Sequence, residues 1–289
     1  MNAAKEKYRM KDKICVVTGA NVGIGKVTAL ELAGMGATVV MVCRNREKGE
    51  AAAVEIVSAT GNKSVHLLVG DLSSQKEVRD MAARFKERFD SLHVLVNNAG
   101  GLVPTRQLSA DGIEKTFATN HLGYFLLTNL LLDLLVRSAP SRIVNVSSDV
   151  HRLARLDFDN LQGERKYAQF QAYALSKLAN VLFTYELAQR LDGKKVTVNG
   201  LHPGGVNSNF YNNSGKGLRF FSDFFGWTMR SPEKGAETVI YLASSPEVEG
   251  ITGKYFKDKK AIPSSKLSMD GENARRLWEV SEEMVKLKQ

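Results

Sequence analysis

The sequence is poor in the residues that build disulfide and metal frameworks. Only two of its 289 residues are cysteine, Cys15 and Cys43, and both lie inside apolar runs. No C-x-x-C pair occurs, and the five histidines show no metal-ligand spacing. The sequence therefore predicts a reducing compartment, no disulfide framework and no metal.

Long hydrophobic runs are missing as well. The most leucine-rich stretch, residues 126–136, contains Thr128, Asn129 and Asp133, so it is too short and too polar to cross a bilayer. The first thirteen residues are polar and rich in lysine, without the apolar core of a signal peptide. These features predict a cytoplasmic protein.

The charge is unbalanced towards the basic side. Lys and Arg number 40 against 31 Asp and Glu, which gives a net charge of +9 and a pI of about 9.4. A basic balance favours anionic partners. The basic residues are dispersed, however, with small excesses only at 5–13 and 254–260, and no nucleic-acid-binding motif accompanies them. We therefore expect no nucleic-acid partner.

Short apolar runs alternate with longer segments of helical period, which is typical of β-α-β units. The runs are rich in Val and Ile without polar alternation, as expected for strands buried on both faces of a parallel sheet. We predict one α/β domain over 1–289, a doubly wound parallel sheet in three layers. The predicted strands are 14–18, 38–43, 65–69, 92–96, 142–146 and 196–201, and the predicted helices are 24–34, 47–59, 74–89, 113–136, 172–191, 232–245 and 272–287.

Three segments do not fit the alternation. Residues 149–170 form a long mixed-charge insertion, and residues 264–289 form a tail with a predicted helix and no assigned role. Residues 205–231 include an aromatic, glycine-containing and basic stretch at 210–227. That stretch suits a lid over a lipophilic substrate. Peripheral contact with an anionic membrane, or packing on the body or on a partner subunit, are the alternatives.

A glycine-rich turn, TGANVGIG at 18–25, follows the first predicted strand and precedes a helix. Such a turn permits close approach of a pyrophosphate, and the helix start offers unpaired N–H groups. Its spacing is neither G-x-G-x-x-G nor that of a P-loop. A tight turn without a ligand is the alternative interpretation.

The second predicted strand ends in Cys43-Arg44-Asn45-Arg46, with Lys48 beyond, and offers no carboxylate for the ribose hydroxyls of NAD. A guanidinium can instead bind a 2′-phosphate through paired hydrogen bonds. We expect NADP(H) preference, read by Arg44 with Lys48 or Arg46 assisting. Solvated charges at the start of a surface helix are the alternative.

Tyr173 and Lys177 are four residues apart in a predicted helix, so they share one face. A nearby ammonium favours a phenolate, which would make tyrosine an acid or base near neutral pH. Other polar residues fall at predicted strand ends or near them: Asp71 with Leu72, 97–100, Asn120 and Ser148. Helix caps and turns are the alternative interpretations of these residues.

Taken together, these motifs resemble the short-chain dehydrogenase/reductase family over residues 11–260. The cues are T-G-x-x-x-G-x-G at 18–25, N-N-A-G at 97–100, Asn120, Ser148, Y-x-x-x-K at 173–177, and Pro203-Gly204. The chain is most similar to the retinol dehydrogenase and protochlorophyllide reductase-like branch. The cues for this branch are C-R-N at 43–45, N-V-L-F at 180–183, H-P-G at 202–204, and the long gap between Ser148 and Tyr173.

The resemblance implies a Rossmann-type fold and a set of catalytic roles. Tyr173 would exchange the proton with the substrate oxygen, and Lys177 would lower the pKa of the phenol and hold the nicotinamide ribose. Ser148 would bind the substrate together with Tyr173 and polarise the carbonyl, while Asn120 would anchor a water in a relay through Lys177. The residues expected to bind NADP(H) are Gly19, Asn21, Gly23, Ile24, Gly25, Arg44, Asp71, Leu72, Asn98, Ala99, Gly100, Tyr173, Lys177, Pro203, Gly204 and Val206.

These roles predict an NADP(H)-dependent oxidoreductase that interconverts an alcohol and a carbonyl on a lipophilic small molecule, such as a retinoid, a steroid or an aliphatic aldehyde or ketone. An NADP(H)-sensing binding protein without turnover is the alternative. Two features depart from the family pattern: we expect no N-terminal apolar anchor of the kind that animal retinol dehydrogenases often have, and Asn207-Ser208 stands where the family usually has a threonine. A stripe of leucines at 127, 130, 131 and 134 lies in a helix that the family often uses between subunits, so we expect a homo-oligomer, a dimer or tetramer.

Overall fold

The computed structural model describes residues 10–205 and 230–287. Its centre is one eight-stranded sheet of order β3-β2-β1-β4-β5-β6-β7-β8, parallel except for the β7–β8 pair. The doubly wound α/β fold expected from the sequence is thereby confirmed. The strands are β1 (Ile14–Thr18), β2 (Thr38–Cys43), β3 (Val65–Val69), β4 (Val94–Asn97), β5 (Ser141–Val146), β6 (Val196–His202), β7 (Lys254–Lys257) and β8 (Lys260–Ile262).

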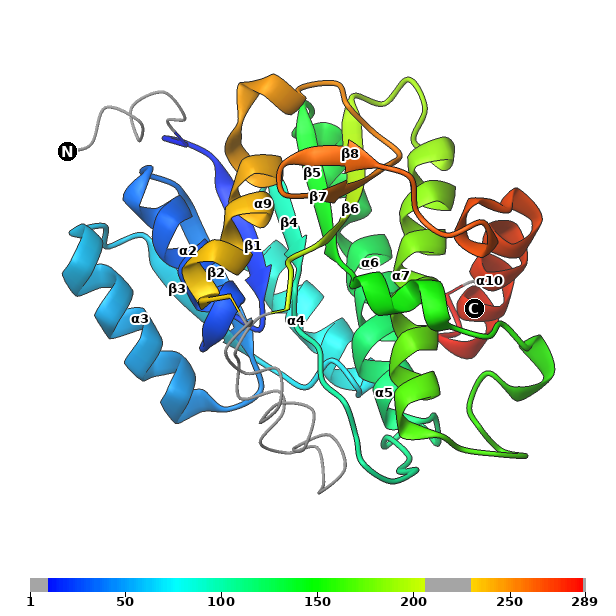
Figure 1. Ribbon diagram of the computed structural model, residues 1–289. Coiled ribbons are helices and arrows are strands. Elements are labelled where there is room, and N and C mark those ends of the chain that lie inside the picture. Colours follow the sequence, from blue (N-terminus) through cyan, green and yellow to red (C-terminus); the bar gives the residue numbers. More distant parts are fainter. Residues whose placement is uncertain (1–9, 206–229, 288–289) are drawn as a thin grey trace.

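Helices cover both faces of the sheet (Figure 1). Side chains of α2, α3 and α9 pack with one face in one apolar cluster, and those of α4, α6, α7 and α10 pack with the other face in a second cluster. The helices are α2 (Gly23–Gly34), α3 (Arg46–Thr60), α4 (Gln75–Arg88), α5 (Lys115–Phe117), α6 (Gly123–Arg137), α7 (Gln169–Arg190), α9 (Pro232–Ser244) and α10 (Gly271–Met284).

The strands of the sheet's centre are buried on both faces, which explains why they read as unbroken apolar runs. In β1, Val16 belongs to the cluster on the α7 side, while Cys15 and Val17 belong to the cluster on the α2 side. The parallel register brings the carboxyl ends of these strands to one edge, because Asn97 pairs with Asn145 and Val146 with Leu201. Ligands of open α/β sheets bind at this edge.

The predicted helix 113–136 is in fact interrupted. A short α5 passes into a π-helix at Ala118–Leu122, and α6 begins only at Gly123. A π-turn holds more than 3.6 residues, so it rotates the residues within it relative to a regular helix. Asn120 lies in this π-turn and is fully buried.

Strands β7 and β8 were not predicted from the sequence. The two strands have four and three residues, and their turn uses Asp258 and Lys259 at positive φ instead of glycine. Short strands without an Asn-Gly or Asp-Gly turn carry little hairpin signal. Smaller corrections concern β4, which starts at Val94 rather than residue 92, and α10, which ends at Met284 rather than residue 287.

The C-terminal helix α10 packs against α7 (Figure 1), and its Trp278 also contacts α6. The Trp278 ring lies 4.8 Å from that of Phe125 in α6 and 5.8 Å from that of Phe183 in α7. Leu127, Leu131 and Leu134 of the leucine stripe are buried in the same cluster. In the described part of the chain, no helix combines the length and apolar character needed to cross a membrane.

Candidate active site at the carboxyl edge of the sheet

The glycine turn between β1 and α2 has the geometry of a phosphate cradle. Gly19 and Gly23 adopt φ values of 67° and 58°, which favour glycine. A Cβ at Gly25 would overlap the carbonyl oxygen of Gly19. Val22 is the N-cap residue of α2, and its side chain makes no hydrogen bond to the N–H groups of the first turn. The N–H groups at this helix start can therefore serve an anion, so these residues fit a dinucleotide pyrophosphate.

Thr18 ties this turn to the segment after β4. Its hydroxyl accepts hydrogen bonds from the backbone N–H groups of Asn98 (2.8 Å) and Ala99 (3.0 Å), and the Asn98 amide donates to the Thr18 carbonyl at 2.8 Å. Asn97 serves the sheet instead, since its amide donates to Asn145 and Thr128 in the core. These hydrogen bonds hold the turn at 19–25 next to residues 98–100.

Arg44 and Asp71 meet at the ends of β2 and β3. The guanidinium lies 3.5 Å from the carboxylate, and the Arg44 side chain is 71% exposed and so accessible to a phosphate. Asp71 accepts from the backbone and hydroxyl of Ser73. The N-cap of α4 is Ser74, so the N-cap interpretation of Asp71 is wrong. Both side chains stand where an adenosine would lie on the fold.

Tyr173 and Lys177 project from the first turns of α7 into the same region. The Lys177 Nζ lies 5.6 Å from the centre of the Tyr173 ring and donates to the Val146 carbonyl at 3.1 Å. Tyr173 is half-buried, whereas Lys177 is buried. Burial lowers the pKa of Lys177 to about 8, so most of the lysine remains charged at pH 7.

Asn120 lies beside this pair. Its amide donates to the Gly101 carbonyl at 2.8 Å and to the Ser176 hydroxyl at 3.0 Å, and its Oδ1 accepts from the Gly101 N–H. A Cβ at Gly100 would lie 3.3 Å from Asn120 Oδ1 and 3.4 Å from Lys177 Nζ. Gly100, Asn120 and Lys177 therefore surround one small space.

Ser148 follows β5 and starts the 3-10 helix Asp149–Leu153. Its hydroxyl accepts from the Val150 N–H at 3.4 Å, which is a long and weak cap. The preceding Ser147 donates to the Lys177 carbonyl at 2.7 Å and so joins the end of β5 to α7. The hydroxyl of Ser148 keeps its capacity to donate a hydrogen bond.

The chain after β6 also reaches this edge. Gly204 has a φ of 91°, and a Cβ there would lie 2.6 Å from Cδ of Arg230. Pro203 and Gly204 follow His202, the last residue of β6. Val206, Ser208 and nearly all of the stretch 205–231 fall outside the described residues.

Two histidines beside Ser148 were not recognised as site residues from the sequence. His151 bonds the Ser148 carbonyl, and His202 accepts from the Asp149 N–H. Burial lowers the pKa of His151 below its usual value and that of His202 to about 4. The H-P-G motif at 202–204 was noticed only as a family cue, and no spacing rule connects these rings to Ser148.

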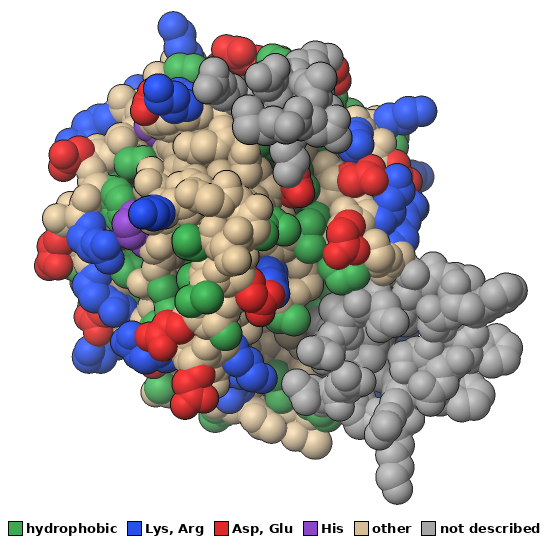
Figure 2. Space-filling model, turned by 90° about the vertical axis from the view of Figure 1, so that its left-hand side faces the viewer, with side chains coloured by type: hydrophobic (Ala, Val, Ile, Leu, Met, Phe, Trp, Pro, Cys, Tyr) green, Lys and Arg blue, Asp and Glu red, His purple; other side chains and the backbone are tan. Residues whose placement is uncertain are grey.

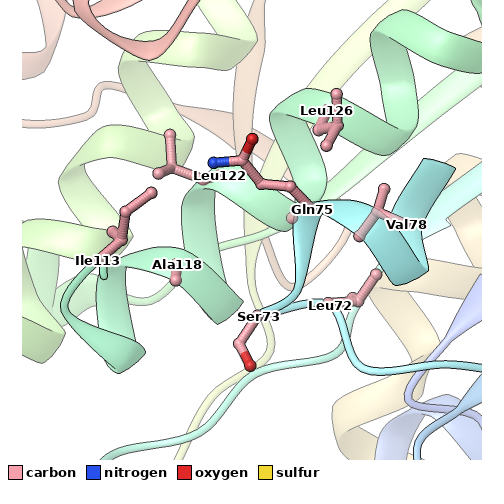
Figure 3. Close-up of a pocket in the computed structure, with 9 residues that line it drawn as sticks. Leu72, Ser73, Gln75, Val78, Ile113, Ala118, Leu122 and Leu126 are labelled. Carbon is pink, nitrogen blue, oxygen red and sulfur yellow. The ribbon is translucent and has the colours of Figure 1, made fainter. Parts of the chain in front are cut away.

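A small cavity in the structure lies apart from this set of residues. It has a volume of about 10 Å³ and a mostly apolar lining between α4 and α6 (Figure 3). Of the predicted site residues it touches Leu72 alone. A space of this size holds at most one water, so it is not a ligand site.

Comparison with known proteins identifies a family model and many relatives. The model described as short chain dehydrogenase matches residues 13–218. The chain is 46% identical to retinol dehydrogenase 11 of Homo sapiens over 279 residues, 96% of this chain and 87% of that protein. It is 45% identical to retinol dehydrogenase 13 of Homo sapiens over 291 residues, 99% of this chain and 88% of that protein.

Several solved structures are also similar to this chain over most of its length. A crystal structure of an uncharacterized protein from Mycobacterium paratuberculosis superposes with a TM-score of 0.79 at 33% identity and covers 98% of this chain and 97% of its own. The RhlG/NADP complex of Pseudomonas aeruginosa has a TM-score of 0.70 at 27% identity and covers 93% of this chain and 99% of its own. A short chain dehydrogenase from Shigella flexneri complexed with NADP has a TM-score of 0.69 at 26% identity. The match covers 88% of this chain and 100% of that chain.

Proposed function

Because the chain belongs to the short chain dehydrogenase family and is therefore a nicotinamide-dependent oxidoreductase acting on CH–OH groups, we propose that it interconverts an alcohol and a carbonyl of a lipophilic small molecule, with NADP(H) as cofactor and Tyr173 as the acid or base. The observation that carries this proposal is the approach of Lys177 Nζ to within 5.6 Å of the Tyr173 ring, at the edge of the sheet that holds the glycine turn.

The cofactor supplies or accepts the hydride, and the protein supplies orientation and one tuned acid. Tyr173 donates its hydroxyl proton to the substrate oxygen during reduction and takes it back during oxidation. The charged Lys177 stabilises the phenolate that results. Ser148 donates a hydrogen bond to the same oxygen and polarises the carbonyl. Asn120 anchors a water that returns protons through Lys177.

NADP(H) preference is supported by the exposed guanidinium of Arg44 at the end of β2 and by relatives of known structure in complex with NADP. The 2′-phosphate would replace Asp71 as the partner of Arg44, or share it. Gly19, Asn21, Gly23, Ile24 and Gly25 would hold the pyrophosphate. Asp71, Leu72, Asn98, Ala99 and Gly100 would enclose the adenosine and the adjoining ribose, while Lys177, Pro203, Gly204 and Val206 would enclose the nicotinamide riboside.

The substrate proposal rests on the relatives. Proteins named retinol dehydrogenase share 44–46% of their residues with this chain across nearly all of its length. Retinaldehyde and retinol are therefore the first substrates to test, followed by steroid ketones and aliphatic aldehydes. The aromatic stretch 210–227 stays a proposed lid or membrane contact, and flotation with anionic liposomes separates these roles.

An NADPH-oxidation assay across lipophilic carbonyls tests the function. We expect turnover with at least one of them and a kcat/KM for NADPH at least about tenfold above that for NADH, because a charge-assisted bidentate bond contributes about 1.5–3 kcal/mol. Arg44→Ala should remove most of that preference, whereas Arg137→Ala, a surface control, should keep it. Equal efficiency with NADH would contradict NADP(H) preference. NADPH binding without turnover on any carbonyl would favour the sensing protein.

A further inference from the structure

Two histidine rings, the buried His151 and the partly buried His202, are bonded to the turn that carries Ser148. His151 is 1% exposed; its Nδ1 lies 2.8 Å from the Ser148 carbonyl oxygen, and its Nε2 lies 3.1 Å from the Ser265 N–H nitrogen. A backbone N–H can only donate, so Nε2 is the acceptor and the ring proton sits on Nδ1. His151 therefore donates to Ser148 and accepts from Ser265 as a neutral ring with one tautomer.

His202 binds the same peptide, between Ser148 and Asp149, at its N–H. Its Nδ1 accepts from the Asp149 N–H at 3.2 Å, which leaves the proton on Nε2, 3.6 Å from the Asp149 carboxylate. His202 is also the last residue of β6, directly before Pro203 and Gly204. It thus connects the Ser148 turn to the segment proposed to face the nicotinamide.

Strand β7 fixes the orientation of this cluster. The Tyr255 ring meets the His151 ring edge-on at 4.9 Å, and its hydroxyl donates to the Asp149 carboxylate at 3.4 Å. Lys257 donates to the same carboxylate at 2.9 Å. The His151 ring has little freedom to turn, because it is bonded through both nitrogens and packed against Tyr255.

The partner of His151 comes from the C-terminal segment that follows β8. The adjacent Ser264 hydroxyl is bonded to Tyr185 of α7 and to Ser268, each at 2.7 Å. Arg152 donates to the Pro263 carbonyl at 2.5 Å. Residues 263–268 are therefore anchored to α7 and present the Ser265 N–H to His151 as a fixed donor.

We propose that His151 and His202 are positioning residues that fix the direction of the Ser148 hydroxyl, and that residues 263–268 belong to the active site through His151. The inference rests on the proposed role of Ser148. Among the described residues, the Ser148 hydroxyl has only a 3.4 Å cap contact of its own, so its direction follows from the orientation of the Ser148–Asp149 peptide. His151 fixes the carbonyl that ends residue 148, and His202 fixes the N–H that follows it.

A double-mutant cycle between His151→Phe and Ser148→Ala tests this inference, with kcat measured at saturating NADPH and carbonyl. Ser148→Ala should lower kcat by roughly 10²–10³-fold, the usual cost of one donor to a developing oxyanion. His151→Phe alone should lower kcat by about tenfold to hundredfold through misplacement of that donor. In the Ser148→Ala background, His151→Phe should have no further effect, because there is no hydroxyl left to place.

Two further variants separate positioning from general loss of structure. His151→Asn keeps an N–H near the Nδ1 position and should recover part of kcat; it also replaces His151→Phe in the cycle should the latter fail to fold. His93 is the matched control, since its Nδ1 accepts from the Ile14 N–H at the opposite end of the sheet. His93→Phe should change kcat less than about twofold, although its Tm falls.

The outcomes distinguish the two claims. A His151→Phe effect of the same size in both backgrounds would overturn the positioning role and leave the function of Ser148 intact. A Ser148→Ala variant with the kcat of the wild type would overturn the proposed role of Ser148, and the inference would fall with it.

Discussion

At the scale of single residues, the proposed catalysis depends on the charge of Lys177. Its ammonium is buried and donates a hydrogen bond to the Val146 carbonyl. Burial lowers its pKa to about 8, which is still above neutral pH. The lysine therefore keeps the charge that a phenolate on Tyr173 requires, and it loses that charge within a range that kinetics can reach.

We predict an alkaline limb in the pH profile of carbonyl reduction. The kcat/KM for NADPH should fall above about pH 8 as Lys177 loses its proton, since this ratio reports the ionisation of the free enzyme. Lys177→Arg should keep its charge, so the limb of its residual activity should move to higher pH. A wild-type profile that stays flat from pH 7 to 10 would contradict a titrating Lys177.

Several site residues predicted from the sequence lie close together in the structure. The reason is that the carboxyl ends of parallel strands share one edge of the sheet. Lys177, Asn120 and Gly100 meet around one space even though 77 positions separate the first from the last. His151 and His202 escaped notice for a physical reason. Their role depends on which nitrogen faces which backbone group, and no spacing along the chain encodes that.

At the scale of elements, the helical periodicity was a good guide except where a helix changes type. The expected segment 113–136 becomes α5, a π-turn and α6, and periodicity cannot show one extra residue in one turn. The strands in the middle of the sheet were predictable from their apolar runs. Strands β7 and β8 were not, because they are short and lie at the edge.

Helix α10 completes the core on the α7 side. Trp278 is 5% exposed, and besides its two phenylalanine neighbours it lies under the Arg190 guanidinium at 4.2 Å. Replacement of Trp278 by Ala should lower the free energy of unfolding by about 3–5 kcal/mol, the usual cost of deleting a buried aromatic ring. Glu279→Ala, at an exposed position of the same helix, is the control and should change it by less than about 0.5 kcal/mol.

Urea unfolding followed by circular dichroism measures this difference. A loss below about 1 kcal/mol for Trp278→Ala would mean that α10 frays from α7 in solution. The helix would then contribute little to the stability of the fold.

At the scale of the whole molecule, the surface carries charges of both signs. The face seen in Figure 2, over α3, mixes Lys and Arg with Asp and Glu.

The expected homo-oligomer stays a prediction. Helix α10 covers Phe125 of α6 and Phe183 of α7, so a dimer built on those residues would require α10 to move, and light scattering measures the oligomer size.

Acid should destabilise the fold through His121 and His202. Burial lowers the pKa of both His121 and His202 to about 4, while an unfolded histidine titrates near 6.5. The unfolded state therefore binds more protons as pH falls from 6.5 towards 4, and stability declines over that window. Each histidine should cost about 2 kcal/mol at pH 5 relative to pH 7.5.

The variant His121→Gln isolates one share of this effect. Glutamine has no proton to gain in this range and can still bond the Ser281 hydroxyl, the partner of His121. Its free energy of unfolding should therefore change less between pH 7.5 and pH 5 than that of the wild type. The same pH dependence in both proteins would show that His121 is not held neutral by the fold.

The most direct test of the central claim is a paired measurement of turnover and NADPH binding for Tyr173→Phe. We predict that kcat with a carbonyl accepted by the wild type falls by at least about 10³-fold, because the hydroxyl proton is the one transferred. The Kd for NADPH should stay within about twofold, since the ring and Lys177 remain. Turnover near that of the wild type would contradict the role of Tyr173 as the acid, and with it the mechanism.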